Sequence, residues 1–524
     1  TVAILAQAPK HPAATHQAMP KMAQGVVDAG AEVVAEEEAA QKRRLRSTMI
    51  AATSNLSAAY NLVNINLAHL EIENQYCHGD SCRAQVTAAS TACLVGAIAG
   101  QLTFGYVGDC LGRSRALQLT LTLCIAGAAA SALAVPLDPG TPSSIFASVS
   151  AARFLLGVGV GGVYPLSATI AAESSTSANR GRSVSLVFSM QGVGQLLVPL
   201  VSMALLYGLG TADARASGGS GLVGISWRCI LGIGALPGII LMPLITTSGG
   251  GGGSQQATLA RAPRQLTLRQ ALAQRSVWPK LIGCAGGWFL FDIPFYGNAL
   301  FAPIVLKSVF HEGSQATPTI GPSLPENLCL QLLILALIGL PGYYIAVWLM
   351  DRAGRKNIQL QGFAMTGVLY LVLGLFLDRL KRNPLLMLLT YGLTYFFSNF
   401  GPNSTTFILP SETFPYEVRS SLNGVCAAAG KLGAVVGSAG FKPLVGVAGM
   451  SSAFYASAAC AVAGALLTAL FVEDRRNRDI DDESRLVEGA RELVEGMLSL
   501  PHLRVDGYLG SEALELKRLS ASSG

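Results

Sequence analysis

The chain has 524 residues, of which 51% are hydrophobic and only 13% are charged. A soluble globular protein carries roughly a quarter charged residues, and the mean hydropathy of +0.45 agrees with the shortage. This composition excludes a soluble enzyme, a nucleic-acid-binding protein and a disordered scaffold. The net charge of +6 comes from basic residues scattered between apolar stretches, which does not suggest a polyanionic partner. The composition indicates an integral protein of the lipid bilayer.

Twelve apolar stretches follow one another along the chain. A stretch of about 20 apolar residues crosses the hydrocarbon core of a bilayer as a helix. We therefore expect transmembrane helices over 48–70, 86–107, 115–136, 145–171, 184–207, 223–246, 278–306, 327–349, 358–377, 385–410, 420–445 and 450–472. The predicted fold class is an all-α membrane protein with twelve transmembrane helices.

The longest internal polar segment, 247–277, divides the spans six and six and opens with the flexible run Gly249–Gly253. This predicts an N-terminal six-helix bundle over 48–246, a linker loop over 247–277, and a C-terminal six-helix bundle over 278–473. Hydrophilic tails over 1–47 and 474–524 flank the two bundles, and a cytosolic surface helix is expected near 484–500.

Basic residues predict the orientation of these segments. Clusters at Lys42–Arg46 and Arg475–Arg478 lie just outside the first and last spans. Cytoplasmic segments carry the excess of Lys and Arg, so we expect both tails and the linker in the cytoplasm, although the basic residues within 379–382 fall on the predicted outer side. Cys77 and Cys82 flank a polar loop, and a disulfide can join them if that loop is extracellular.

Two motifs repeat between the halves. The pattern Asp-x-x-Gly-Arg follows the second span at Asp109–Arg113 and the eighth span at Asp351–Arg355, 242 residues later. A Glu and an Arg seven residues apart recur 239 residues apart, as Glu173 with Arg180 and as Glu412 with Arg419. Two unrelated features at nearly one offset indicate a duplicated six-helix unit with pseudo-two-fold symmetry.

The Asp-x-x-Gly-Arg loops resemble the signature of the major facilitator superfamily. We expect these charged residues to form a cytoplasmic gate latch that is made and broken during transport; the alternative is a role in topology and folding only. The expected gating residues are Asp109, Arg113, Glu173, Arg180, Asp351, Arg355, Glu412 and Arg419.

Polar side chains within the predicted spans are costly and are functional candidates by default. In span seven, Trp288, Asp292 and Tyr296 follow one another at four-residue spacing and lie along one helix face. Span eleven carries Lys431, and span five carries Gln191 240 residues earlier, so these two should face each other across the pseudo-two-fold axis.

Span ten adds a polar stripe of Tyr395, Asn399 and Asn403. One cation, one carboxylate, amides and phenols at similar depth predict a site for a small anion, and Lys, a compact donor, suits phosphate. The alternatives are a structural ion pair between Asp292 and Lys431 and simple packing of the aromatic residues.

At these stretches the sequence resembles the phosphate:proton symporters of the major facilitator superfamily, found in fungi and plants. The likeness covers 48–473 and is carried by 161–168, 288–296, 399–403 and 429–431. The resemblance implies alternating-access transport of inorganic phosphate in the plasma membrane, with protons as a second partner and without cofactor or metal. It places Tyr164, Gln191, Trp288, Asp292, Tyr296, Asn403 and Lys431 around the phosphate.

Two positions depart from that family. Its first span has Asp-x-x-Asp where this chain has Ala58 to Asn61, and its fourth span has Asp where this chain has Val163. Those carboxylates are the family's proton carriers, so we expect proton coupling to be weakened or absent. Asp292 is the mid-membrane acid that remains matched to the family. In its ionised form Asp292 would repel the anion, and in its protonated form it would donate a hydrogen bond beside Lys431.

Two further functions stay open at this point. An organophosphate such as a glycerophosphodiester would need a wider pocket, which Val163 in place of Asp could reflect. A non-transporting nutrient receptor would use the 474–524 tail as its output module. An enzyme is not expected, because the sequence has no metal-ligand spacing, nucleophile elbow or phosphate-binding loop.

Overall fold

The computed structural model describes residues 18–77, 82–138, 140–209, 221–247, 266–299 and 325–474. Within these ranges the chain is helical between short connections and contains no strand. The chain divides into two units, residues 1–47 and 48–524. The first unit contains the beginning of α1 (Ala18–Val63), where Lys42 and Glu38 form an exposed ion pair 3.9 Å apart.

The helices of the N-terminal half of the second unit follow the first six predicted spans. They are the end of α1 with α2 (Ile65–Tyr76), α3 (Arg83–Leu111), α4 (Arg113–Ala132), α5 (Ile145–Glu173) after the short η2 (Pro142–Ser144), α6 (Arg180–Gly208), and α8 (Gly221–Gly232) with η3 (Ile233–Ala235) and α9 (Leu236–Thr247).

The C-terminal half repeats this series. Its helices are α12 (Val277–Leu281) with the π-helical turn η4 (Ile282–Gly286) and α13 (Gly287–Ala299), α15 (Pro325–Ala353), α16 (Arg355–Leu375), the connecting α17 (Leu377–Lys381), α18 (Pro384–Asn399), α19 (Pro402–Thr413), η5 (Tyr416–Val418), α20 (Arg419–Ala448) and α21 (Met450–Phe471).

Each predicted span coincides with one of these helices or with abutting helices, which confirms the all-α membrane fold. In the part of the chain that the structure describes, nine helices are long and apolar enough to cross a bilayer. The spans that fall outside this group are divided: span one between α1 and α2, span seven at η4, and span ten between α18 and α19. Residues 300–306 of predicted span seven lie outside the described residues.

Predicted span ten, 385–410, is divided into two helices. The helix stops at Asn399 and restarts at Pro402, because proline has no N–H for a helical hydrogen bond. The break lies against α16, where a Cβ on Gly401 would stand 2.5 Å from the Gly362 Cα. Close backbone contact with α16 thus fixes the start of α19.

Small residues set the distances between the helices. On α20, a Cβ at Gly433 or Gly437 would collide with the backbone carbonyl of Phe289 or Ile293 on α13. In the N-terminal half, Gly157 on α5 lies equally close to the Cys93 carbonyl of α3. The hydrophobic effect does not drive helices together inside a lipid bilayer. Close van der Waals packing at small residues therefore contributes much of the stability of helix association.

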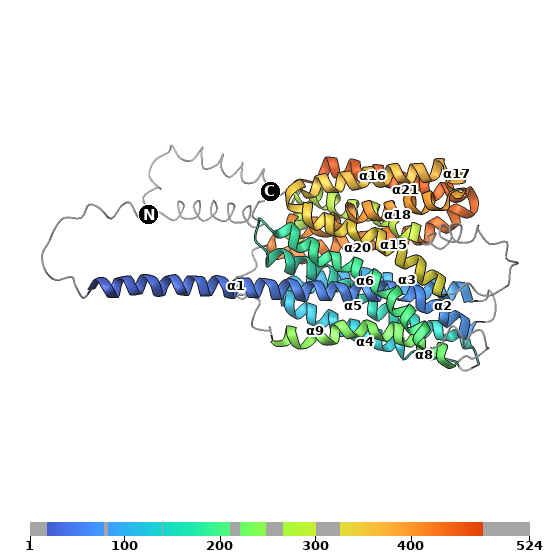
Figure 1. The fold of residues 1–524 in the computed structure, drawn as a ribbon, viewed down its shortest axis with the longest axis horizontal. Helices are drawn as coiled ribbons and strands as arrows, with labels where there is room; N and C mark the ends of the chain where they lie inside the picture. Colours follow the sequence, from blue (N-terminus) through green and yellow to red (C-terminus); the bar gives the residue numbers. More distant parts are fainter. Residues whose placement is uncertain are drawn as a thin grey trace. The chain divides into compact units, whose positions relative to one another are not determined.

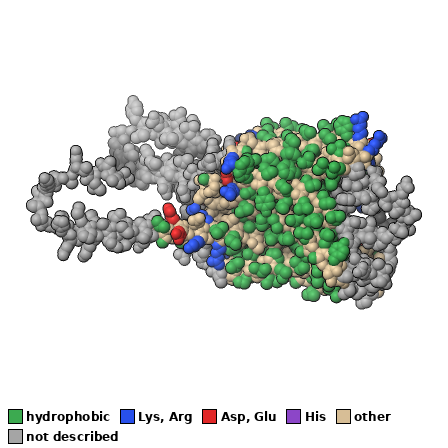
Figure 2. Space-filling view, viewed as in Figure 1, with side chains coloured by type: hydrophobic (Ala, Val, Ile, Leu, Met, Phe, Trp, Pro, Cys, Tyr) green, Lys and Arg blue, Asp and Glu red, His purple; other side chains and the backbone are tan. Residues whose placement is uncertain are grey.

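The second unit presents an apolar flank. Figure 1 shows α4, α8 and α9 along one side of this unit and α16, α17 and α21 along the other. On the face seen in Figure 2, a broad belt of hydrophobic side chains covers the helices, and Lys and Arg side chains lie near its edges. On α21, Val462, Leu466 and Leu470 are exposed apolar side chains, as expected for helices that contact lipid.

The structure describes the predicted loop with Cys77 and Cys82, the linker and the two tails only in part. The disulfide between Cys77 and Cys82 is present. In the predicted linker 247–277, α11 (Leu268–Ala273) begins with a capping box between Thr267 and Gln270, whereas 248–265 lie outside the described residues. The same holds for 1–17 and for 475–524, which include the helix expected near 484–500.

Candidate functional site

One pocket gathers all seven residues that the sequence assigned to the anion site. Its lining is Tyr164 of α5, Gln191 of α6, Trp288, Asp292 and Tyr296 of α13, Asn403 of α19 and Lys431 of α20, together with Phe188 and Phe295. Both halves of the chain therefore contribute to it. The lining side chains close on one another and leave no space as large as a water molecule, so a ligand would have to part them.

Lys431 is the positive charge of the pocket. Its Nζ lies 3.1 Å from the Asp292 Oδ2 and donates to the Tyr296 hydroxyl at 2.9 Å. The same ammonium lies 4.6 Å from the ring centre of Tyr296 and 5.5 Å from that of Tyr164, within the range of a cation–π contact. The ion pair between Asp292 and Lys431, which the sequence left open as the alternative to an anion site, is thus present, and both side chains are buried.

Amides and phenols surround this ion pair. The Tyr164 hydroxyl donates to the Gln191 Oε1 at 3.0 Å. The Asn403 Nδ2 donates both to the Tyr343 hydroxyl at 2.9 Å and to the Asn399 Oδ1 at 2.8 Å. These groups are buried neutral donors and acceptors, which can exchange their mutual hydrogen bonds for bonds to an anion.

Aromatic rings form the remaining wall. Phe188 of α6 stacks on Phe407 of α19 with ring centres 4.5 Å apart, and the Trp288 ring meets Phe407 edge-on at 6.4 Å. A Cβ at Gly430 would collide with the Trp288 ring, so the glycine beside Lys431 makes room for the indole. Stacking between α6 and α19 joins the two halves at the pocket.

The sequence prediction missed part of this lining. Phe188 and Phe295 of the lining gave no signal, and neither did Phe407, which stacks on Phe188, because a phenylalanine in an apolar span is ordinary for a membrane helix. The sequence did hold a signal for Tyr343, because a phenol inside the apolar eighth span needs a hydrogen-bond partner. Its partner is Asn403.

The two Asp-x-x-Gly-Arg loops adopt the same conformation at one end of the unit, here called the latch end. Gly112 joins α3 to α4 and Gly354 joins α15 to α16, with φ angles of +91° and +89°. Residues other than glycine rarely adopt such angles. The repeat seen in the sequence is therefore also a repeat in structure.

The aspartate of each loop caps a helix of the opposite half. Asp109 accepts hydrogen bonds from the backbone N–H groups of Ser420 and Ser421 on α20, at 3.2 Å and 2.7 Å. Asp351 accepts from those of Gly181 and Arg182 on α6, at 3.0 Å and 2.8 Å. A carboxylate at a helix N-terminus satisfies otherwise unpaired N–H groups and complements the helix dipole.

The arginine of each loop binds acids of its own half. Arg113 lies 3.2 Å from Asp109 and 3.1 Å from Glu173. Arg355 lies 3.0 Å from Asp351 and holds both carboxylate oxygens of Glu412, at 2.7 Å and 2.8 Å. These contacts orient the two capping aspartates.

Glu173 connects the halves a further time. Its Oε1 lies 3.2 Å from the Arg419 Nη1, while the Arg180 Nε donates to the Ala172 carbonyl at 3.3 Å. The structure thus brings all eight predicted gating residues to the latch end. The role of this latch in gating is a proposal.

The positions that depart from the resembling family lie inside the N-terminal half. Ala58, Asn61 and Val163 are all fully buried, and none of them lines the pocket. The Asn61 Nδ2 donates to the carbonyls of Ser57 and Gly234, at 2.9 Å and 2.7 Å. A neutral amide thus occupies a position where the family has an acid.

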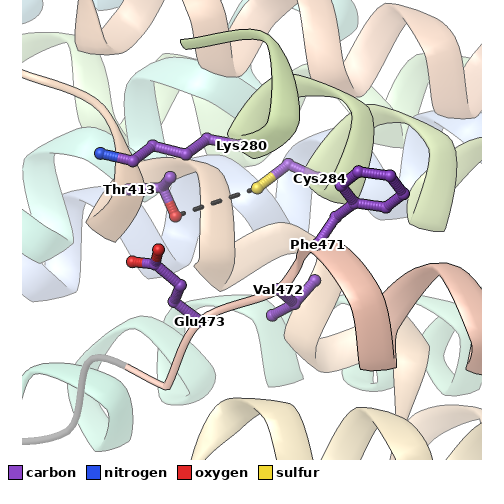
Figure 3. A pocket seen from close by; sticks show the side chains of 6 residues that line it. All are labelled: Lys280, Cys284, Thr413, Phe471, Val472 and Glu473. Atoms are coloured by element: carbon purple, nitrogen blue, oxygen red, sulfur yellow. Dashed lines mark hydrogen bonds between the residues drawn. The ribbon is translucent and has the colours of Figure 1, made fainter. Parts of the chain in front are cut away.

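A second hollow near the end of α21 is lined by Lys280, Cys284, Thr413, Phe471, Val472 and Glu473. Figure 3 shows the Cys284 thiol directed at the Thr413 hydroxyl, 3.9 Å away, and Lys280 and Glu473 extending to the same side. None of the residues that the sequence assigned to the anion site lines this hollow.

Comparisons with known proteins agree with this architecture. The Major Facilitator Superfamily matches residues 59–438. The probable inorganic phosphate transporter 1-8 of Arabidopsis thaliana is 32% identical over 526 residues, which cover 87% of this chain and 96% of the relative. The inorganic phosphate transporter 1-6 of rice (Oryza sativa subsp. japonica) is 34% identical, with coverage of 76% and 83%.

Solved structures share the fold. The proton:xylose symporter XylE superposes with a TM-score of 0.70 at 21% identity, covering 85% of this chain and 99% of that one. The transporter FucP superposes with a TM-score of 0.60 at 11% identity, covering 82% of this chain and all of that one. The duplicated helices, the paired loops and these matches show that the chain belongs to the Major Facilitator Superfamily and, within it, to the family of the inorganic phosphate transporters.

Proposed function

We propose that this protein carries inorganic phosphate across a membrane by alternating access, with the pocket around Lys431 as its binding site. One observation carries the proposal: a single ammonium group, ringed by amides and phenols, lies in a closed pocket built from both halves of the chain. The names of the relatives, which are inorganic phosphate transporters, support the same substrate.

In this mechanism the anion takes the place of the Asp292 carboxylate at Lys431. The ammonium then balances the charge of phosphate, and the freed hydroxyl of Tyr296 donates to it. Gln191, Asn403 and Tyr164 exchange their present hydrogen bonds for bonds to phosphate oxygens, and Trp288 forms an apolar wall. Separation of the two halves at one end of the pocket and then at the other would admit and release the anion.

The latch would control one of these two openings. Its aspartates cap helices of the opposite half, and Arg419 reaches Glu173 across the interface. Opening the latch end requires these contacts to break, which makes them a bistable element of the kind that switching proteins use. We place the latch end and both termini in the cytoplasm and the protein in the plasma membrane.

Proton coupling would depend on Asp292. A protonated Asp292 can leave Lys431 to the anion, whereas an ionised one competes with it. Because Asn61 and Val163 cannot titrate, coupling through this single acid should be weak. A wider organophosphate has less support, since the relatives are named inorganic phosphate transporters.

Uptake of radiolabelled phosphate into proteoliposomes that contain the purified protein tests the proposal. We expect saturable uptake that unlabelled phosphate suppresses and glycerophosphocholine does not. Binding of phosphate without any uptake would instead identify a receptor. Suppression by glycerophosphocholine at concentrations equal to those of phosphate would identify an organophosphate carrier.

A further inference from the structure

Two buried amide side chains at the interface between the halves have no hydrogen-bond partner. Gln101 belongs to α3 and Asn423 to α20, and at most 1% of either residue is exposed. In the part of the chain that the structure describes, neither the oxygen nor the nitrogen of either amide bonds to another group. Buried polar groups in proteins are rarely left unpaired, and each exception calls for a specific role.

Both amides lie where α3 crosses α20. A Cβ on Gly105 would stand 2.6 Å from the Ser420 carbonyl oxygen and 3.2 Å from the Gly424 Cα, and a Cβ on Gly424 would collide with the backbone carbonyl of Gln101. Gln101 and Gly105 are four residues apart on one face of α3, and Asn423 directly precedes Gly424. The two amides therefore flank a close contact between the N-terminal and the C-terminal half.

Along the two helices, the amides lie between the pocket and the latch end. Asn423 is eight residues from Lys431 on α20, and Gln101 is eight residues from Asp109 on α3, which at the rise of an α-helix is about 12 Å in each case. Leu432, nine residues after Asn423 and therefore half a turn around α20, is exposed. Asn423 thus lies on the side of α20 that is turned away from lipid.

The repeat places a residue that contacts the pocket at the position equivalent to Gln101. The loop aspartates Asp109 and Asp351 are 242 residues apart, and the same offset leads from Gln101 to Tyr343 on α15. The Tyr343 hydroxyl accepts a hydrogen bond from the pocket residue Asn403 at 2.9 Å. Because the halves are related by a pseudo-two-fold axis, Gln101 lies at the same depth as a side chain that borders the anion pocket.

We propose that Gln101 and Asn423 form a second, uncharged site for phosphate on the path between the pocket and the latch end. The inference rests on the transport function proposed above. When the latch end opens, α3 parts from α20, and the N–H groups of both amides can donate to phosphate oxygens. A neutral site holds the anion less tightly than Lys431 does, which suits a step of release, because an ion must bind weakly enough along its path to leave.

This role separates the rate of transport from the affinity of the pocket. Neither Gln101 nor Asn423 lines the pocket around Lys431, so replacing either one leaves the pocket donors in place. Leucine has a similar size but no donor, so it makes this step of the path apolar. Because neither amide bonds to another described group in the closed protein, leucine at either position should not lower the Tm.

The test uses Gln101→Leu and Asn423→Leu, purified and reconstituted in the same way as the wild-type protein. Equilibrium binding of radiolabelled phosphate in detergent should give the wild-type Kd for both variants. The maximal rate of phosphate uptake into proteoliposomes should fall at least about ten-fold in each, because hydrogen bonds to the passing anion are lost. Gln101→Ala and Asn423→Ala, which add no bulk, should show the same split between Kd and rate.

Gln359→Leu is the matched control. Gln359 is a buried glutamine that bonds to Thr468 inside the C-terminal half, and its replacement should leave the maximal rate unchanged. A wild-type rate in the leucine and alanine variants of Gln101 and Asn423, or an equal fall in Gln359→Leu, would overturn the second site and leave phosphate transport standing. Parallel loss of binding and uptake would also overturn it, because the amides would then support the pocket itself. Absence of phosphate uptake by the wild-type protein would instead contradict the proposed function.

Discussion

At the scale of single residues, the pocket depends on one ammonium group that serves two partners. The Lys431 Nζ holds both Asp292 and Tyr296, and the three side chains come from α13 and α20. A buried lysine without a partner would be unstable, so the ion pair keeps the pocket folded when no anion is bound. To bind at Lys431, phosphate must therefore displace the Asp292 carboxylate.

Replacing Lys431 should remove phosphate binding. Loss of one member of a buried, hydrogen-bonded charge pair costs about 2 kcal/mol or more, so Lys431→Ala should weaken phosphate affinity by at least about 30-fold. Lys431→Arg should also bind poorly, because the planar guanidinium is larger than the ammonium that this closed pocket holds. Equilibrium binding of radiolabelled phosphate to purified, monodisperse protein measures both, and near-normal affinity in Lys431→Ala would end the assignment.

Replacing Asp292 should remove the carboxylate that competes with phosphate for Lys431. Asp292→Asn keeps the shape of the side chain but removes the charge that opposes the anion at Lys431. We expect phosphate affinity at neutral pH to be retained or increased, and its change between pH 5.5 and 7.5 to be smaller than in the wild type. The same binding assay checks this. A more than ten-fold loss of affinity would mean that the carboxylate itself holds the bound anion.

At the scale of helices, backbone contact fixes how α13 and α20 present the pocket. Gly437 of α20 faces the Ile293 carbonyl, whereas Gly440, one turn further on, faces open space. Gly437→Ala should therefore force the helices apart and destabilise the protein by about 1–3 kcal/mol. Thermal unfolding in detergent should show a lower Tm for this variant and no decrease for Gly440→Ala, its matched control. Equal Tm values for the two variants would contradict the close packing.

The latch makes a second prediction at this scale. Asp109→Asn weakens the charge-assisted cap on α20, which we expect to cost about 1–2 kcal/mol and to shift the latch toward opening by about five- to thirty-fold. A cysteine placed at Thr169, which is buried beside Ser420, should then react faster with a maleimide. Asp138→Asn, in the loop before α5 and away from the latch, is the control and should leave the rate unchanged. No acceleration in Asp109→Asn would remove the gating role.

At the scale of the whole molecule, the duplicated halves meet along matched helices. Asp109 on α3 caps α20, and Asp351 on α15 caps α6, so the interface repeats itself about the pseudo-two-fold axis. One arrangement of contacts thus serves both halves. Both capping contacts lie at the latch end, so both must break when that end opens.

The orientation of the molecule in the membrane is testable as a whole. The basic clusters at Lys42–Arg46 and Arg475–Arg478 predict that both termini face the cytoplasm. A protease added to sealed, right-side-out vesicles should leave residues 474–524 intact, and the same protease should remove them after detergent opens the vesicles. Cleavage of this tail in sealed vesicles would reverse the predicted topology.

The sequence by itself indicated the number of spans, the duplication and seven of the nine side chains that line the pocket around Lys431. Those features are local or periodic: apolar length marks a span, and a polar residue such as Lys431 or Asp292 inside one is too costly to be accidental. The charged residues of the repeated motifs lie at the ends of equivalent spans, so the sequence alone could assign them to one end of the molecule.

Only the tertiary structure decided which groups meet. Glu173 contacts Arg113 of its own half at 3.1 Å and Arg419 of the other half at 3.2 Å. The second contact joins residues 246 positions apart in the sequence, which only helix packing brings together. Tyr343 and Phe407 contact the pocket residues Asn403 and Phe188, and these contacts follow from helix packing rather than from the sequence pattern.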